Sequence, residues 1–263
     1  MIAINLKGKC AVVCGSTQGI GKATAHELAD LGASVILLAR NEPALATVAK
    51  QLNTSHGQEH HYVVADFANA DYVRGQAQKI IKDHNHVHIL INNTGGPAAG
   101  PAIDATPAAF LEAFQAHLIC NQHLVQAFVP GMQAAGYGRI INVISTSVKA
   151  PIPNLGVSNT IRGAVANWSK TLANELGPSG ITVNNVLPGL TETARLESLI
   201  QGNANKQGIP PQQVAENMKK SVPARRFATA QEVAYAIAFL ASPAAAYING
   251  TNLPVDGGRL ASL

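Results

Sequence analysis

A glycine-rich segment near the start of the chain has the residue types and spacing of a phosphate-binding turn. It lies between an apolar run and an amphipathic helical pattern, and it consists of Gly15, Ser16, Thr17, Gln18, Gly19, Ile20 and Gly21. Gly15 permits a tight turn, and Gly19 has no Cβ, so the backbone can approach a pyrophosphate closely. Gly21 lets the next helix pack closely, and the start of that helix adds N–H donors and partial positive charge. The segment predicts a dinucleotide site, the alternative being a merely tight turn.

The segments that must position this turn alternate between two patterns. Short β-branched runs predict strands over residues 10–14, 34–39, 61–65, 88–92, 139–144, 182–187 and 252–255. Longer periodic segments predict helices over residues 22–31, 43–52, 72–83, 107–134, 163–176 and 231–241. The alternation predicts an α/β fold, a doubly wound parallel sheet of about seven strands with helices on both faces. Such a sheet binds its ligand at the carboxyl ends of the strands.

No repeat or linker divides the chain, so we expect a single domain over residues 1–263. One stretch, residues 195–223, breaks the alternation. It is polar, it contains Pro210-Pro211, and it lies between a strand end and a later helix. We interpret residues 195–223 as a substrate lid over the crevice.

The composition argues against several other classes of protein. Hydrophobic residues make up 47% of the 263 positions and charged residues 13%, which is typical of a globular chain with a large core. The net charge of +4 is not gathered in a basic run, and no apolar run is long enough for a membrane span. We therefore expect neither a nucleic-acid nor a membrane partner. Three irregularly placed cysteines favour a soluble protein of the reducing cytoplasm. His84, His86 and His88 alternate, but no cysteine or carboxylate cluster completes a ligand set, so no metal is expected.

Several motifs, in the same order along nearly the whole chain, resemble those of the short-chain dehydrogenase/reductase family. The glycine turn has that family's GxxxGxG spacing, and Asn92-Asn93-Thr94-Gly95 is similar to its NNAG motif. The other matching residues are Asp66 at the adenine-holding position, Pro188, Gly189, Thr191 and Thr193 in the turn that contacts the nicotinamide and pyrophosphate, and the C-terminal Asp256-Gly257-Gly258. The segments NNTGGP, SVKAPIPN and SNTIR most resemble an atypical subgroup near the 3-oxoacyl-[acyl-carrier-protein] reductases.

This resemblance implies a Rossmann-type NAD(P)-binding domain and an oxidoreductase that acts on a carbonyl or alcohol substrate. It also implies cofactor contacts from the glycine turn, Asp66, Asn93 and the turn at 188–193, and a homotetramer. The apolar helical segments 107–134 and 163–176 would face the neighbouring subunits, although their apolar content would suit a core equally well.

Charge at the end of the second predicted strand indicates which dinucleotide binds. A carboxylate about twenty residues beyond the glycine turn selects NAD, because it bonds the adenosine ribose 2′-hydroxyl. Here the position is Ala39, and Arg40 follows it. An arginine can pair with a 2′-phosphate as a fork, so we expect NADP(H) in preference to NAD.

The catalytic positions of the family are mostly substituted. The resemblance places Ser145 at the position of the serine that binds the substrate carbonyl. The tyrosine and lysine that follow in the family correspond to Ser158 and Arg162, and the relay asparagine corresponds to His117. A serine hydroxyl stays un-ionised without a base, and an arginine does not release a proton at usable pH. Arg162 can still bond ribose hydroxyls, so the pair would hold cofactor but be poor in acid–base catalysis.

Three other sources of a proton stay open. His117 titrates near neutrality when unperturbed, but it could equally be a packed helix histidine bonded to a carbonyl. Lys149 could orient a substrate or be a solvated loop residue, and water could enter the crevice. Two functions follow: an NADP(H)-dependent carbonyl or alcohol oxidoreductase with a degenerate catalytic tetrad, or a catalytically inactive NADP-binding sensor or subunit of a hetero-oligomer.

Overall fold

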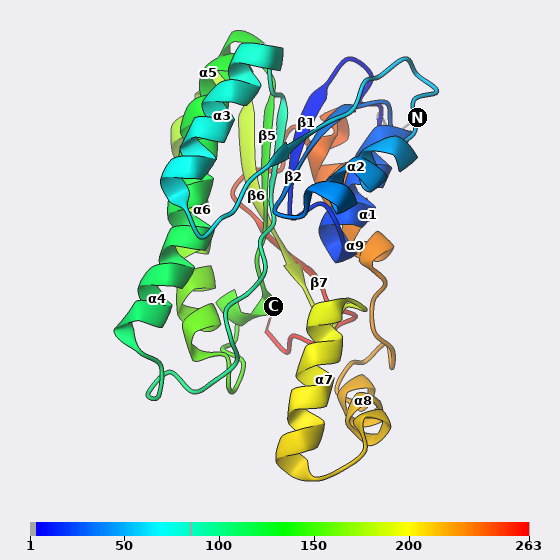
Figure 1. The fold of residues 1–263 in the computed structure, drawn as a ribbon, viewed down its shortest axis with the longest axis vertical. Helices are drawn as coiled ribbons and strands as arrows, with labels where there is room; N and C mark the ends of the chain where they lie inside the picture. Colours follow the sequence, from blue (N-terminus) through cyan, green and yellow to red (C-terminus); the bar gives the residue numbers. More distant parts are fainter. Residues whose placement is uncertain (1–3, 85, 263) are drawn as a thin grey trace.

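A parallel sheet of seven strands lies at the centre of the computed structural model, which describes residues 4–84 and 86–262 (Figure 1). The remaining residues of the predicted domain, 1–3, 85 and 263, lie outside the described residues. The strands are β1 (Cys10–Cys14), β2 (Ser34–Ala39), β3 (His61–Val64), β4 (Ile89–Asn92), β5 (Gly138–Val143), β6 (Ile181–Pro188) and β7 (Asn252–Val255). Their order is β3-β2-β1-β4-β5-β6-β7, and every neighbouring pair is parallel. The predicted doubly wound sheet is confirmed.

Helices cover both faces of the sheet (Figure 1). They are α1 (Gly19–Asp30), α2 (Glu42–Gln51), α3 (Ala70–His84), α4 (Pro107–Phe114), α5 (Cys120–Ala134), α6 (Gly156–Leu176), α7 (Ala194–Gln207), α8 (Pro211–Lys220) and α9 (Ala230–Ala241). Alternate residues of β1 point to opposite faces: Ala11 and Val13 pack with α1, α2 and α9, whereas Val12 and Cys14 pack with α3 and α5. Within the described residues, no helix has the length and apolar character required to cross a bilayer.

Two helix boundaries differ from the sequence prediction. The predicted helix over 107–134 is interrupted by a π turn at Gln115–Ile119, which separates α4 from α5. The second difference is that α6 begins at Gly156, seven residues before the predicted start. Ser158 and Thr160 are poor helix formers, but Val157 and Ile161 pack on Ala113 of α4, so tertiary burial overrides local propensity there.

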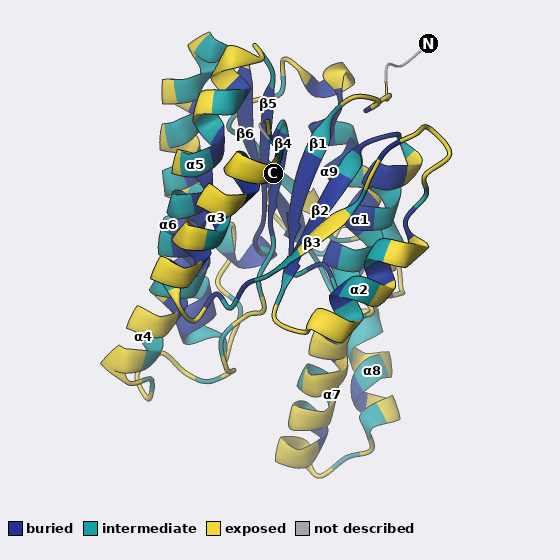
Figure 2. Cartoon of the chain, turned by 45° about the horizontal axis from the view of Figure 1, so that its top comes forward, coloured by how far each residue is buried: buried dark blue, intermediate teal, exposed yellow. Residues whose placement is uncertain are grey.

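The segment that breaks the sequence pattern, residues 195–223, is a helical hairpin. Helices α7 and α8 pack against each other and project beyond the carboxyl ends of the strands (Figure 1), and most of their surface is exposed (Figure 2). Only a few apolar side chains are buried in them, among them Leu196, Ala204 and Val214. That narrow apolar stripe explains why the sequence prediction placed no helix there. Gly208, with φ of +65°, ends α7.

The start of α1 lies unusually close to the ends of β1 and β4. A Cβ at Gly15 would lie 2.5 Å from the carbonyl oxygen of Asn93, and Gly15 has a φ of +60°. A Cβ at Gly21 would lie 2.7 Å from Nδ2 of Asn93 and would overlap the carbonyl of Gly15. Both positions therefore require glycine, and the predicted tight turn with close helix packing is confirmed.

A row of four asparagines, three of them buried and Asn252 half-buried, crosses the other half of the sheet. Asn92, Asn142, Asn185 and Asn252 are paired in register on β4, β5, β6 and β7. Each donates from Nδ2 to Oδ1 of the next, over distances of 2.8, 3.1 and 2.8 Å. Since buried amides cost free energy unless they are bonded in this way, the row fixes the register of four strands.

We expect Gly21→Ala to lower the free energy of unfolding by about 1–3 kcal/mol, because the new methyl group must displace backbone and an asparagine amide. Gly163→Ala in α6 is the matched control, since a Cβ there meets nothing within 4 Å. That control should stabilise the protein by about 0.5–1 kcal/mol. Denaturant unfolding of both variants measures the difference, and equal stability of Gly21→Ala and the wild type would contradict the close packing.

Candidate cofactor and reaction site

Two motifs that are distant in the sequence meet at the carboxyl ends of the strands. A Cβ at Gly19 would lie 3.1 Å from Cγ2 of Thr193, and Gly19 has a φ of +53°. The glycine turn after β1 and the turn after β6 therefore face each other. The side chain of Gln18, the residue before α1, does not cap the helix, so it leaves the first N–H groups of α1 available to an anion.

The turn after β6 is held firmly. Gly189 donates its N–H to Val255, and a Cβ at Gly189 would lie 2.7 Å from Cα of Asp256. The Thr191 hydroxyl donates to the carbonyl of Gly189 over 3.3 Å, and Thr193 caps the start of α7. Pro188 ends β6, so the four residues expected to contact the nicotinamide and pyrophosphate form one rigid turn.

The expected adenosine side is formed by residues that follow β1, β2, β3 and β4. Ser16 is buried and bonds the carbonyl of Leu38 through both its N–H and its hydroxyl. The side chain of Asp66 accepts the N–H of Ala68 over 3.1 Å. Asn93 donates from Nδ2 to the carbonyls of Cys14 and Gly15.

Arg40 follows β2 directly and is exposed. Among the described residues it forms no ion pair with a carboxylate. Thr17 and Ile20 are half-buried within the glycine turn. The glycine turn lets the backbone approach a phosphate closely, and the uncapped start of α1 offers free N–H groups. With the guanidinium of Arg40 beside them, these features fit a phosphorylated dinucleotide.

Arg162 is buried where β4 and β5 end. Its guanidinium donates to the carbonyl of Val143 over 3.2 Å and to that of Thr94 over 3.3 Å. Burial, together with the nearby charge of Arg195, lowers the pKa of Arg162 to about 10. The side chain therefore stays cationic at neutral pH and joins two strand ends.

His117 lies on the π turn, and only 2% of it is exposed. Its Nδ1 is 2.5 Å from the hydroxyl of Thr94, so its partner is a side-chain hydroxyl instead of the carbonyl expected for a packed histidine. Burial, reinforced by the charge of Arg162, lowers the pKa of His117 to about 2. The imidazole is therefore neutral at physiological pH and lacks the charged form that a general acid near neutrality requires.

The two serines of the expected tetrad lie on different elements. Ser145 lies two residues after Val143, the last residue of β5, and its Oγ accepts the N–H of Ser147 over 3.0 Å. This bond leaves the Ser145 hydroxyl proton free to be donated to a ligand. Ser158 lies one turn before Arg162 on the buried face of α6. Lys149 is exposed at the end of the short helix that follows Ser145.

Sequence reasoning missed two residues of this region. Thr94 links His117, through its hydroxyl, to Arg162, through its carbonyl. The sequence offered one signal for this role, because Thr94 stands where the NNAG motif of the family has alanine. Arg195, in the first turn of α7, donates to the carbonyl of Pro97 over 2.9 Å and so joins the hairpin to the loop after β4. Nothing in the local sequence indicated that contact.

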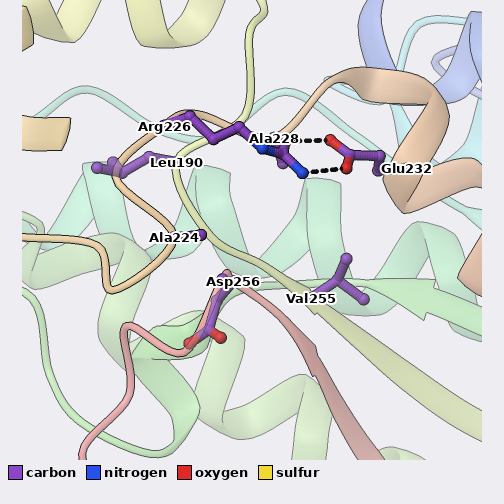
Figure 3. A pocket seen from close by; sticks show the side chains of 8 residues that line it. Leu190, Ala224, Arg226, Ala228, Glu232, Val255 and Asp256 are labelled. Carbon is purple, nitrogen blue, oxygen red and sulfur yellow. Dashed lines mark hydrogen bonds and ion pairs between the residues drawn. The ribbon is translucent and has the colours of Figure 1, made fainter.

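A cavity of about 120 Å³ lies behind the turn after β6 (Figure 3). Arg226 and Glu232 form a two-bonded ion pair at its wall, over 2.7 and 2.6 Å. The cavity is lined by residues that include Leu190, Ala228 and Asp256, and by none of the four expected catalytic residues. It therefore lies at the base of the hairpin and is not the reaction site.

Histidines gather at the opposite, amino end of the sheet, where the rings of His61 and His84 are 4.5 Å apart. Within the part of the chain that the structure describes, no group of three His, Cys, Asp or Glu side chains is arranged to hold a metal ion.

This chain is similar to known reductases over nearly its whole length. A family model described as enoyl-(acyl carrier protein) reductase matches residues 15–259. The 3-oxoacyl-[acyl-carrier-protein] reductase FabG of Haemophilus influenzae is 34% identical over 96% of this chain and 98% of its own length. The NADPH-dependent reductase BacG of Bacillus subtilis is 30% identical over 97% of this chain and 99% of its own.

The structure of L-sorbose reductase from Gluconobacter frateurii, solved with NADPH and L-sorbose, superposes with a TM-score of 0.93. It is 30% identical and covers 99% of this chain and 100% of its own. The chain belongs to the short-chain dehydrogenase/reductase family, the class of NAD(P)-dependent oxidoreductases that its motifs predict. Two of these proteins have NADPH in their name or structure, which agrees with the NADP(H) that we expected from Ala39 and Arg40.

The neutral state of His117 makes stability depend on pH. Between about pH 6.5 and 2 the unfolded chain protonates this imidazole and the folded chain does not, so stability falls as the pH falls. Below about pH 5.5, the loss in the free energy of unfolding that is due to His117 approaches 1.4 kcal/mol per pH unit. We therefore expect the free energy of unfolding of His117→Asn to fall less steeply than that of the wild type as the pH is lowered. Denaturant unfolding at several pH values measures the slopes, with exposed His56→Asn as the control that keeps the wild-type slope.

Proposed function

We propose that this protein is an NADP(H)-dependent carbonyl reductase or alcohol dehydrogenase, similar to the 3-oxoacyl-[acyl-carrier-protein] reductases, that works with a degenerate catalytic tetrad. NADPH, when bound, supplies the hydride. The observation that carries the proposal is the orientation of Ser145. Its Oγ accepts a backbone N–H, so its proton is available to the substrate oxygen at the carboxyl end of β5.

The roles of the other residues follow from their contacts. Arg162 keeps a positive charge between β4 and β5, where it can bond ribose hydroxyls in place of the usual lysine. Ser158 takes the place of the usual tyrosine and has no ionisation near neutrality. Since His117 is neutral and bonded to Thr94, water is the proton source that we favour, and we expect slow turnover.

One observation favours the second candidate, an inactive NADP-binding sensor or subunit of a hetero-oligomer. Neither His117 nor Arg162 changes its protonation near pH 7, so the site has no evident acid–base group to replace the tyrosine. The two candidates share cofactor binding and differ only in turnover.

A homotetramer is part of the same proposal. On α4, Leu111 is 70% exposed and Phe114 38%, and Ile103 just before that helix is 92% exposed. Apolar side chains gathered on one edge in this way are typical of a subunit interface, which supports contacts through α4 and its neighbours.

Replacement of Ser145 tests the proposed function. We expect Ser145→Ala to lower the rate of NADPH oxidation by a panel of ketones by about 10²–10³ and to leave NADPH affinity unchanged. Ser147→Ala is the control, because its hydroxyl has no partner in the described residues and its N–H stays in place. Tight NADPH binding by the wild type without oxidation by any ketone would favour the sensor.

Arg40 tests the choice of cofactor. A charge-assisted contact with the 2′-phosphate is worth about 1.5–3 kcal/mol, so Arg40→Ala should weaken NADPH binding roughly tenfold to a hundredfold more than NADH binding. Arg74→Ala on α3, an exposed arginine paired with Asp71, controls for the loss of one charge. Equal weakening of both dinucleotides in calorimetry would mean that Arg40 only supports its loop.

A further inference from the structure

Two arginines from different helices bond carbonyls of the loop after β4. Arg162 of α6 donates to the carbonyl of Thr94, and Arg195 of α7 donates to the carbonyl of Pro97, three residues further on. A Cβ at Gly96, between these two residues, would lie 3.9 Å from the Arg195 guanidinium. Both guanidinium groups therefore lie at one short loop, and that of Arg162 also bonds Val143, the last residue of β5, two residues before Ser145.

Among the described residues, no carboxylate forms an ion pair with the buried Arg162 or with the exposed Arg195. Only 8% of Arg162 is exposed, and two carbonyls occupy only part of its five-donor guanidinium. A buried cation without a counter-charge is costly, and a second cation nearby increases the cost. An anionic ligand would remove that penalty.

The position of Arg195 on its helix adds to the positive potential. It lies in the first turn of α7, where the helix macrodipole is also positive and a cation is unfavourable. Glu197 shares this turn but forms no ion pair with Arg195 within the described structure. Charges so arranged at a ligand site attract an anion.

Given the proposed function, on which this inference rests, we infer that the substrate is a keto acid or hydroxy acid whose carboxylate is bound by Arg195, with Arg162 behind it, while its carbonyl or hydroxyl oxygen meets Ser145. A guanidinium binds a carboxylate through two parallel N–H donors, which fixes orientation as well as affinity. The hairpin that carries Arg195 would then contribute directly to specificity.

The test compares acids with their esters. Acetoacetate, methyl acetoacetate, pyruvate and methyl pyruvate are titrated by calorimetry into protein saturated with NADP⁺, in which no hydride is available and only binding is observed. We expect the wild type to prefer at least one acid over its ester. Arg195→Ala should weaken that acid roughly tenfold and leave the ester unchanged, and Arg195→Lys should restore part of the preference. Arg74→Ala controls for net charge.

Two outcomes would overturn the inference. One is the absence of any acid preference in both pairs. The other is weaker NADP⁺ binding in Arg195→Ala with acid binding unaltered, which would assign the anion to the cofactor's phosphates. Turnover of the same four compounds with NADPH separates this inference from the proposed function. Acid binding without turnover supports the carboxylate site and contradicts the reductase, whereas turnover of esters and acids alike contradicts only the carboxylate site.

Discussion

The close approach of α1 to the ends of β1 and β4 is the constraint on which the site depends. Gly15 and Gly21 leave no room for a Cβ, and Asn93 bonds the two carbonyls at the end of β1. Because three elements meet with only the Asn93 amide between them, the start of α1 lies at the carboxyl edge of the sheet with its first N–H groups available there. Thr193 then approaches from the far side of that edge. A dinucleotide site results from backbone packing, before any charged residue takes part.

Two of the four expected catalytic residues, Arg162 and His117, are connected through Thr94. Arg162 binds the carbonyl of Thr94, and the hydroxyl of Thr94 binds His117. Burial, reinforced by the charge of Arg162, lowers the pKa of His117 and keeps it neutral. The π turn adds the residue that directs His117 inward, as such turns commonly do at functional sites. Replacement of one member would leave buried polar groups without partners. In the proposed mechanism, a fixed cation and a neutral hydrogen-bond chain stand where the family resemblance leads us to expect a titrating acid–base pair.

Beyond this group the asparagine row continues from β4 to β7, and Ser169 of α6 donates its hydroxyl to Asn185. Thus α6 is anchored to the sheet both near its start, through Arg162, and further along, through Ser169. Both anchors are buried and polar, so they specify one register of helix against sheet where apolar contacts alone would tolerate others.

The sequence by itself determined the strands, their parallel arrangement and the location of the nucleotide turn, because period, glycine spacing and β-branched runs are local signals. The sequence also has Ser158 and Arg162 at the positions where the family resemblance predicts tyrosine and lysine, since that comparison requires only the spacing of motifs. Tertiary structure alone decided the protonation of His117, the break in the helix at 115–119 and the fold of residues 195–223. Each of these depends on burial or on a partner distant in the sequence, as with Arg195 and Pro97. No local pattern encodes which groups lose their water when separate elements come together.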